Sequence, residues 1–562
     1  MHVHPARSTQ SLLSFYLVHL RFIAVNMPRP TIDVFEEIRV YPTKVHATPT
    51  TAPLSIVDAS VARFTPSGAI WYFDSLGNGR SWESGALRVS LEHTLSAYPQ
   101  WAGQLRMTPY TLDLHQRKNI ERYGRMEVRY GYDSDPGVAF SIARIGCDIG
   151  DALPGHALKV STGVWACDGL IREDVLLPRT PLAGLGSSPS HMDPCVGVQI
   201  TSFSCGGVSI AAQIAHPLAD ATALSRFMQD WSATHSALQS STTIPHLSPV
   251  FEPWRLDQHA AGNMDDAVPD PKVLEKAHAL PLHRYDWWSS SDGSGFGPNA
   301  HTIPEALRQE QGAKELAEMG TKMPWSSYNV RAPVSHTIIH YTSSQLDRIY
   351  AAAAGYSSSG DGKAKISRHD ALVAHIWCLM NRARGPENGE TSSPVYADVS
   401  FGLRTRLSPP LPSGFLGSPL QIAKVMLPWE TASSSSMLPL VASTIKETLN
   451  EFTPEAIGTQ IYAVAHELSP QRLWQAFLGR QHMLVTSWAH TGLYGCDFGA
   501  PHPARYIHPI MPLVDGCVQI IEGSPTQAPS ENRKWYDDGV DVAIYLEKEA
   551  TEKLIKDTQV RL

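Results

Sequence analysis

The sequence predicts an α/β protein with mixed sheets, built as two similar-sized domains that each have their own core. The chain has 562 residues, of which 43% are hydrophobic and 18% charged, so it is long enough for two large cores. Between residues 194 and 231 the spacing of apolar side chains changes from that of strands to that of a helix. Residues 239–330 are rich in Ser, Thr and Pro and are typical of a long crossover between domains.

These patterns divide the chain into an extension (1–26), a first domain (27–238), the crossover (239–330) and a second domain (331–562). We expect Trp287, Trp288 and Trp325 to anchor the crossover in buried positions, because Trp is usually largely buried. The alternative is that they line the mouth of a cleft. Apolar spacing and turn residues further predict strands at 126–130 and 334–341, helices at 87–95, 304–319, 345–353 and 367–384, and a loop at 177–194.

The clearest local pattern is a hairpin followed by a helix. Two apolar runs, Val196 to Phe203 and Val208 to Ala215, flank Cys205-Gly206-Gly207, and glycine supplies the positive φ that such a turn needs. Leu224, Phe227, Met228 and Trp231 then recur at helical spacing. His216 therefore lies where a strand ends and a helix is about to begin.

His216-Pro217-Leu218-Ala219-Asp220 occupies this junction. Pro217 cannot donate to a sheet ladder and Asp220 is a good N-cap, so both favour a break here. An imidazole at a strand end can take a proton from a hydroxyl or amine near neutral pH. The alternative is a hydrogen-bonded core histidine with Asp220 as a simple cap. Of the 24 histidines, however, only His216 has an aspartate four residues later.

The HPLAD segment resembles the HxxxD signature of the BAHD-type acyl-CoA-dependent acyltransferases. Three further segments are similar to signatures of this family and occur in the family's order. They are TSW at 486–488 with DFG at 497–499, RTRLSPPLP at 404–412, and GFLG at 414–417. The resemblance extends from about Glu36 to Glu549.

This resemblance implies two chloramphenicol-acetyltransferase-like domains with a channel between them. It also implies that an acyl group passes from acyl-CoA, a co-substrate rather than a bound cofactor, to a hydroxyl or amine of a small secondary metabolite. His216 acts as the general base, and the acceptor attacks the thioester directly. No GxSxG elbow is present that would supply an acyl-enzyme.

The matching positions also imply roles for other residues. Thr486 and Trp488 are candidate donors to the oxyanion of the tetrahedral intermediate. Asp220 and Asp497 match two structural aspartates that pair with arginines, for which Arg404 and Arg406 are the candidates, and Gly499 completes the DFG motif. The chain departs from the family in having Ala500-Pro501 where DFGWG is expected and Gly417-Ser418 where GN is usual. Residues 53–58 resemble a further family segment, and we expect them to be scaffold.

Composition limits the partners. A net charge of −8 gives no basic surface for nucleic acid. Seven dispersed cysteines without a CxxC pair favour reduced thiols in a cytoplasmic protein, and no spacing indicates a metal site. The apolar segment 11–25 resembles the h-region of a signal peptide, but it is too short to span a membrane and is interrupted by His19 and Arg21. No small residues in an AxA arrangement follow it, so we expect an extension or a mis-set start codon rather than a signal peptide, and no stable membrane insertion. We expect a monomer.

Two other functions remain open. A carrier-protein-dependent condensation enzyme has a related histidine motif, HHxxxDG, but here Ala215 precedes His216 and Ala221 follows Asp220. A non-catalytic binding protein on the same scaffold is the third possibility, and the intact His216, Asp220, Thr486 and Trp488 argue against it.

Overall fold

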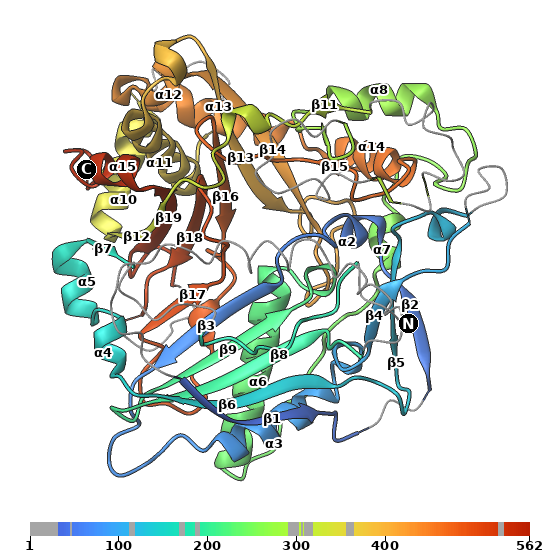
Figure 1. Ribbon diagram of the computed structural model, residues 1–562, viewed down its shortest axis with the longest axis vertical. Helices are drawn as coiled ribbons and strands as arrows, with labels where there is room; N and C mark the ends of the chain where they lie inside the picture. Colours follow the sequence, from blue (N-terminus) through green and yellow to red (C-terminus); the bar gives the residue numbers. More distant parts are fainter. Residues whose placement is uncertain are drawn as a thin grey trace, which may run out of the picture.

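The computed structural model describes residues 32–44, 48–111, 118–167, 175–185, 192–289, 303–304, 307, 319–355, 365–525 and 533–561. Two large mixed sheets form its framework, one in the lower and one in the upper part of Figure 1. The predicted segment 11–25 and most of the predicted helix 304–319 lie outside the described residues. Within the described residues, no helix combines the length and the apolar character needed to cross a membrane.

The first sheet has six strands, mostly from the first half of the chain. Their spatial order is β1 (Ile32–Val40), β6 (Val138–Ile145), β8 (Val196–Phe203), β9 (Val208–Ile214), β3 (Ser67–Phe73) and β17 (Tyr506–Pro509). The predicted hairpin is confirmed, because β8 and β9 pair antiparallel and Gly206 in their turn has φ +79°. Helices α3 (Ser84–Leu95) and α6 (Ala221–Gln239) pack together beside this sheet (Figure 1).

Helix α6 forms where the apolar spacing predicts it. Leu224, Phe227, Met228 and Trp231 are all fully buried and belong to the core shared with the first sheet. The side chain of Asp220 caps the helix by accepting from the Ala223 amide at 3.0 Å. Burial of these four side chains, each worth about 1.5–3 kcal/mol, fixes the helix against the sheet.

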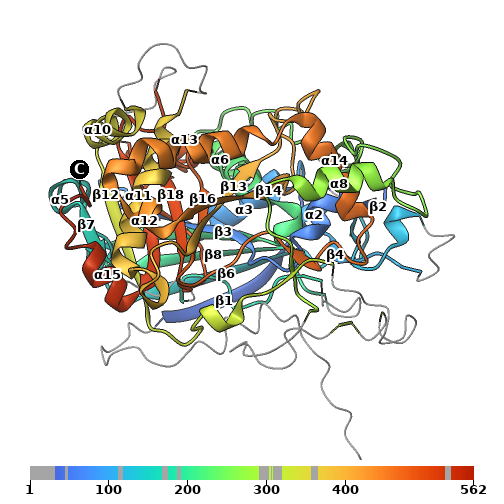
Figure 2. The same cartoon turned by 90° about the horizontal axis from the view of Figure 1, so that it is seen from above.

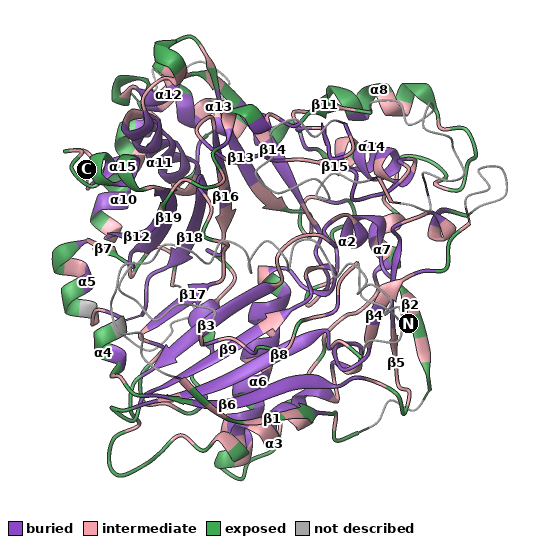
Figure 3. Ribbon diagram, viewed as in Figure 1, coloured by how far each residue is buried: buried purple, intermediate pink, exposed green. Residues whose placement is uncertain are grey.

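The second sheet has seven strands. Their order is β14 (Leu420–Pro428), β13 (Pro394–Gly402), β16 (His482–Ser487), β18 (Cys517–Glu522), β19 (Val540–Glu547), β12 (Val334–Tyr341) and β7 (Val164–Ala166). Helix α11 (Arg368–Arg384) is capped by Ser367 and Asp370 as predicted, and it is buried along most of its length (Figure 3). Four helices surround it: α10 (Ser343–Ala354), α12 (Trp429–Ser433), α13 (Leu438–Asn450) and α15 (Lys548–Leu554) (Figure 2).

Smaller elements complete the fold. Two three-stranded sheets have the orders β11 (Thr321–Lys322), β10 (Tyr285–Asp286), β15 (Leu473–Trp474) and β2 (Thr50–Pro53), β5 (Met126–Tyr130), β4 (Gln104–Met107). The remaining α-helices are α2 (Ile56–Ser60), α4 (Ile149–Ala152), α5 (His156–Thr162), α7 (Trp254–Asp257), α8 (Pro271–Ala279) and α14 (Pro454–Ala465). Trp287 and Trp325 are buried with their rings stacked 5.7 Å apart, as expected, whereas the expected burial of Trp288 is wrong, because its side chain is only half-buried.

The two sheets exchange strands. β17, from the second half, pairs with β3 of the first sheet, and β7, from the first half, pairs with β12 of the second sheet. A shared core containing Tyr72, Ile338 and Tyr545 joins the sheets. The architecture of two large sheets is therefore observed. The domain boundaries at residues 238 and 331 stay a prediction.

Candidate active site

His216 lies just beyond the C-terminal end of strand β9 of the first sheet. β9 ends at Ile214, and His216 opens a single 3₁₀ turn, His216–Leu218, before α6 begins at Ala221. Pro217 stands where the sheet ladder ends, consistent with its lack of an amide proton. The imidazole is partly buried, and its edge meets the Phe64 ring at a centroid distance of 5.4 Å.

Burial controls the charge of this ring. Desolvation disfavours the imidazolium and lowers the pKa of His216 to about 4, although the nearby Asp220 carboxylate opposes the shift. The ring is therefore neutral at physiological pH and able to accept a proton. Its Nδ1 lies 3.0 Å from Ser418 Oγ, whereas Nε2 has no hydrogen-bond partner within the described part of the chain.

The Asp220 carboxylate faces the first turn of α6 and Arg404. Its carboxylate caps α6 and forms a bidentate ion pair with Arg404, with Arg404 Nη2 at 3.0 Å from Asp220 Oδ1. Arg404 also donates to the carbonyl oxygens of Phe415 and Gly417. The pair thus joins the start of α6 to the 404–417 segment of the second half.

The predicted partner of Asp497 is wrong. Asp497 is exposed, and its carboxylate accepts from the Gly499 amide at 2.8 Å in a tight turn where Phe498 and Gly499 have positive φ. Neither arginine reaches it, because Arg404 binds Asp220, and Arg406 donates to the Leu449 carbonyl oxygen at 2.8 Å. Motif order suggested the arginines, but the exposed turn gives Asp497 a local partner instead.

Thr486 and Trp488 lie at the end of β16 in the second sheet. The Thr486 hydroxyl is buried and has no hydrogen-bond partner among the described residues, which is uncommon for a buried polar group. Trp488 is 6% exposed and packs with the core of the first sheet. Within the described residues the Thr486 hydroxyl is thus buried without a partner, and neither side chain forms a hydrogen bond to His216.

Two residues beside His216 were missed by the sequence reasoning. Ser418 is buried and contacts both the ring and the carbonyl oxygen of His216. Asp58 accepts from the Ser418 amide at 2.6 Å, so the 53–58 segment reaches the turn that contacts His216. Both residues stand in segments that resemble the family, and the serine in place of the usual asparagine was the available signal.

One buried cluster has the composition of a metal site. Asp398 lies between His283 and His482, all three buried. Its carboxylate accepts from the Phe477 amide and from His482 Nδ1 at 2.9 Å, and it lies 3.1 Å from His283 Nε2. Burial alone would raise the pKa of Asp398, but the two imidazoles hold it at about 2. These contacts are those of a buried Asp398 carboxylate that is stabilised by hydrogen bonds and by the two neighbouring imidazoles.

An open pocket of about 690 Å³ lies elsewhere. Its lining includes Trp325, Tyr328, Arg480 and Asp515, and none of the predicted site residues. His216 is not among the residues that line it. The predicted channel between the domains therefore stays a prediction.

A profile of the transferase family matches residues 180–268 and 304–560, more than half of the chain and both of its halves. The chain belongs to this family, the BAHD-type acyltransferases. It is therefore an acyl-CoA-dependent acyltransferase, with acyl-CoA as a co-substrate and no bound cofactor implied.

Individual relatives agree with the family assignment. The chain is 29% identical to Acyltransferase AFT15-1 of Alternaria alternata over 84% of this chain and 86% of that protein. It is 26% identical to Acyltransferase abl6 of Leptosphaeria maculans over 94% and 97% of the two chains. The fold resembles that of TRI101 of F. graminearum, solved with ethyl coenzyme A, with a TM-score of 0.60, 13% identity and coverage of 91% and 98%. These likenesses support the predicted two-domain fold.

Proposed function

We propose that His216 is the general base in the transfer of an acyl group from acyl-CoA to a hydroxyl or amine of a small secondary metabolite. The Nε2 atom takes the acceptor proton while the acceptor oxygen or nitrogen attacks the thioester carbonyl. The tetrahedral intermediate then collapses, the C–S bond breaks, and the CoA sulfur leaves with the proton returned from Nε2. One observation carries this proposal: burial keeps the His216 ring neutral, and its Nε2 is unpartnered within the described chain.

The oxyanion of that intermediate needs donors. We assign this role to the Thr486 hydroxyl, supported by its lack of a partner among the described residues, and to the Trp488 indole N–H. Removal of one such donor typically costs about 10²–10³ in rate. The proposal gives structural rather than catalytic roles to the remaining motif residues, which are Asp220, Arg404, Arg406, Asp497 and Gly499.

His216→Ala tests the proposal. General-base assistance is worth about 10²–10⁴-fold, so we expect kcat to fall in that range while the affinity for acyl-CoA and the melting temperature change little. His278→Ala is the matched control, because His278 is exposed on α8, and it should behave as wild type. Near-wild-type turnover in His216→Ala refutes the assignment.

Two other functions are separated by assay. A carrier-protein-dependent condensation enzyme requires a histidine where this chain has Ala215, and it would not release free CoA from acyl-CoA. A non-catalytic binding protein would release no thiol with any acceptor. A thiol-release screen of acyl-CoAs and acceptor alcohols, phenols and amines distinguishes both from the proposed reaction. The prediction of a cytoplasmic monomer is tested by fractionation and light scattering.

A further inference from the structure

A serine hydroxyl and a buried carboxyl lie behind the ring of His216, on the side away from Nε2. We propose that Ser418 and Asp58 are positioning residues that hold His216 in the tautomer with its proton on Nδ1, which leaves the lone pair on Nε2. This inference rests on the proposed function and names the residues that prepare its base.

Counting protons at Ser418 assigns the tautomer. Ser418 Oγ contacts two groups of His216, the carbonyl oxygen and Nδ1, the latter at 3.0 Å. A carbonyl oxygen only accepts, so the single hydroxyl proton of Ser418 is used there. Toward Nδ1 the same oxygen can only accept, and Nδ1 therefore carries the proton. A neutral imidazole protonated at Nδ1 has its lone pair on Nε2.

Asp58 fixes the turn that carries Ser418. The Ser418 amide donates to Asp58 Oδ1 at 2.6 Å, and both residues are fully buried. Gly417 precedes Ser418 with φ +111°, and a Cβ atom there would lie 2.8 Å from Asp58 Oδ1. The carboxyl and the turn therefore approach so closely that only glycine fits between them. The Gly417 carbonyl oxygen also accepts from the Asp220 amide at 3.0 Å.

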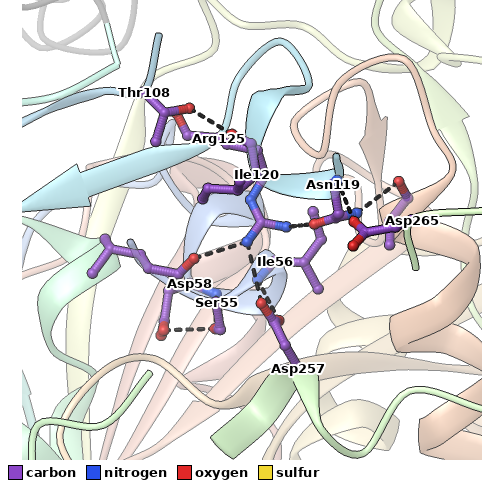
Figure 4. Close-up of polar contacts among 11 residues, drawn as sticks. Ser55, Ile56, Asp58, Thr108, Asn119, Ile120, Arg125, Asp257 and Asp265 are labelled. Carbon is purple, nitrogen blue, oxygen red and sulfur yellow. Dashed lines mark hydrogen bonds and ion pairs between the residues drawn. The ribbon is translucent and has the colours of Figure 1, made fainter. Parts of the chain in front are cut away.

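Asp58 is itself held rigidly (Figure 4). Its Oδ2 accepts from Ser55 Oγ at 2.6 Å, and the α2 amide of Ile56 donates to Asp257 at 2.8 Å. Asp257 pairs with Arg125 at 3.2 Å, and Arg125 also donates to the Leu54 carbonyl oxygen. The short helix α2 is thus clamped at its first turn, and Asp58 has little freedom to move away from Ser418.

The contact does not depend on the charge of Asp58. Burial raises the pKa of Asp58 to about 7, against the hydrogen bonds from Ser55 and Ser418. A carboxyl protonated on Oδ2 can donate to Ser55 Oγ and still accept from the Ser418 amide on Oδ1. An asparagine can do the same, with its carbonyl oxygen toward Ser418. This distinguishes positioning by an acceptor from an electrostatic effect of a carboxylate.

The experiment compares turnover and binding in purified full-length variants. Ser418→Ala removes the hydroxyl oxygen that accepts from Nδ1. A hydrogen bond worth about 0.5–1.5 kcal/mol converts to a kcat loss of about two- to twelvefold, and KM for acyl-CoA should stay within about twofold. Ser225→Ala is the matched control, because Ser225 is a buried hydroxyl on α6 with no hydrogen-bond partner in the described chain. It should retain wild-type kcat.

Variants of Asp58 provide a second, independent test. Asp58→Ala leaves the Ser418 amide unpaired and should reproduce the kcat loss, whereas Asp58→Asn should restore kcat to within about twofold of wild type. Wild-type kcat in Ser418→Ala, with His216→Ala inactive, overturns this inference and leaves the proposed function intact. Asp58→Asn as slow as Asp58→Ala at an unchanged melting temperature also overturns it. Wild-type kcat in His216→Ala instead overturns the proposed function.

Discussion

Asp220→Ala removes two interactions at once. It deletes the N-cap of α6, where Asp220 accepts from the Ala223 amide, and it breaks the bidentate pair with Arg404. The Asp220 side chain is 9% exposed and that of Arg404 16%, so solvent replaces little of what is lost. Because the 3₁₀ turn His216–Leu218 lies just before Asp220, the damage begins beside His216, the proposed base.

The expected cost follows from these contacts. Loss of an N-cap costs about 1 kcal/mol, and removal of one partner of a buried pair costs about 3–5 kcal/mol. Arg404 keeps the carbonyl oxygens of Phe415 and Gly417 as acceptors, which favours the lower end and a total of about 4 kcal/mol. Asp220→Asn keeps the cap oxygen and loses the charge, so it should cost about 2–3 kcal/mol.

Chemical denaturation measures these values, and thermal melting should give the order wild type, Asp220→Asn, Asp220→Ala. A double-mutant cycle with Arg404→Met should give a coupling of about 0.5–3 kcal/mol. If both Asp220 variants unfold like wild type but have lost turnover, Asp220 acts on the substrate and the structural reasoning is refuted.

Three further predictions concern the site. The pKa of His216 is lowered to about 4, so kcat/KM should be level from pH 8 to 6 and fall only as pH approaches 4; a limb near 6.5 would contradict this. The unfolded chain binds this proton more readily, so His216 makes stability decrease as pH falls from 6.5 to 4. Asp497→Asn should change stability by less than about 0.5 kcal/mol, because Asp497 is exposed and asparagine can accept from Gly499; a large loss in denaturation midpoint would reveal a buried partner. Double-reciprocal plots of initial rate against one substrate, at several fixed concentrations of the other, should give intersecting lines, because direct attack requires both substrates to be bound together. Parallel lines, or an acylated protein detected by intact mass, would exclude the mechanism.

Sequence patterns predicted the elements whose signal is local. The hairpin at 196–214, helix α6 and helix α11 are read from apolar spacing, turn glycines and caps that lie within a few residues of one another. The placement of β7 and β17 was not predicted, because Val164–Ala166 is three residues long and its pairing with β12 joins segments far apart in the chain. Periodicity carries no information about such pairings.

At the site too, local motifs were predicted from the sequence and contacts between distant segments were not. The HxxxD spacing located His216 and Asp220, and the conformation of the 404–417 segment decided which arginine binds Asp220. Motif resemblance gave Asp497 an arginine because it could not show that the turn is exposed. The serine at 418 was noted as a departure from the family pattern, but its contact with His216 was not predicted, because it joins residues 202 positions apart.

The exchanged strands make the two halves interdependent products of one polypeptide. A fragment ending in the crossover would lack β17 and expose the edge of β3, while the complementary fragment would lack β7 and expose the edge of β12. Unpaired sheet edges recruit other chains and promote aggregation. During synthesis, the first sheet lacks its last strand until residues 506–509 emerge, so the edge of β3 stays open until just over nine-tenths of the 562 residues have left the ribosome.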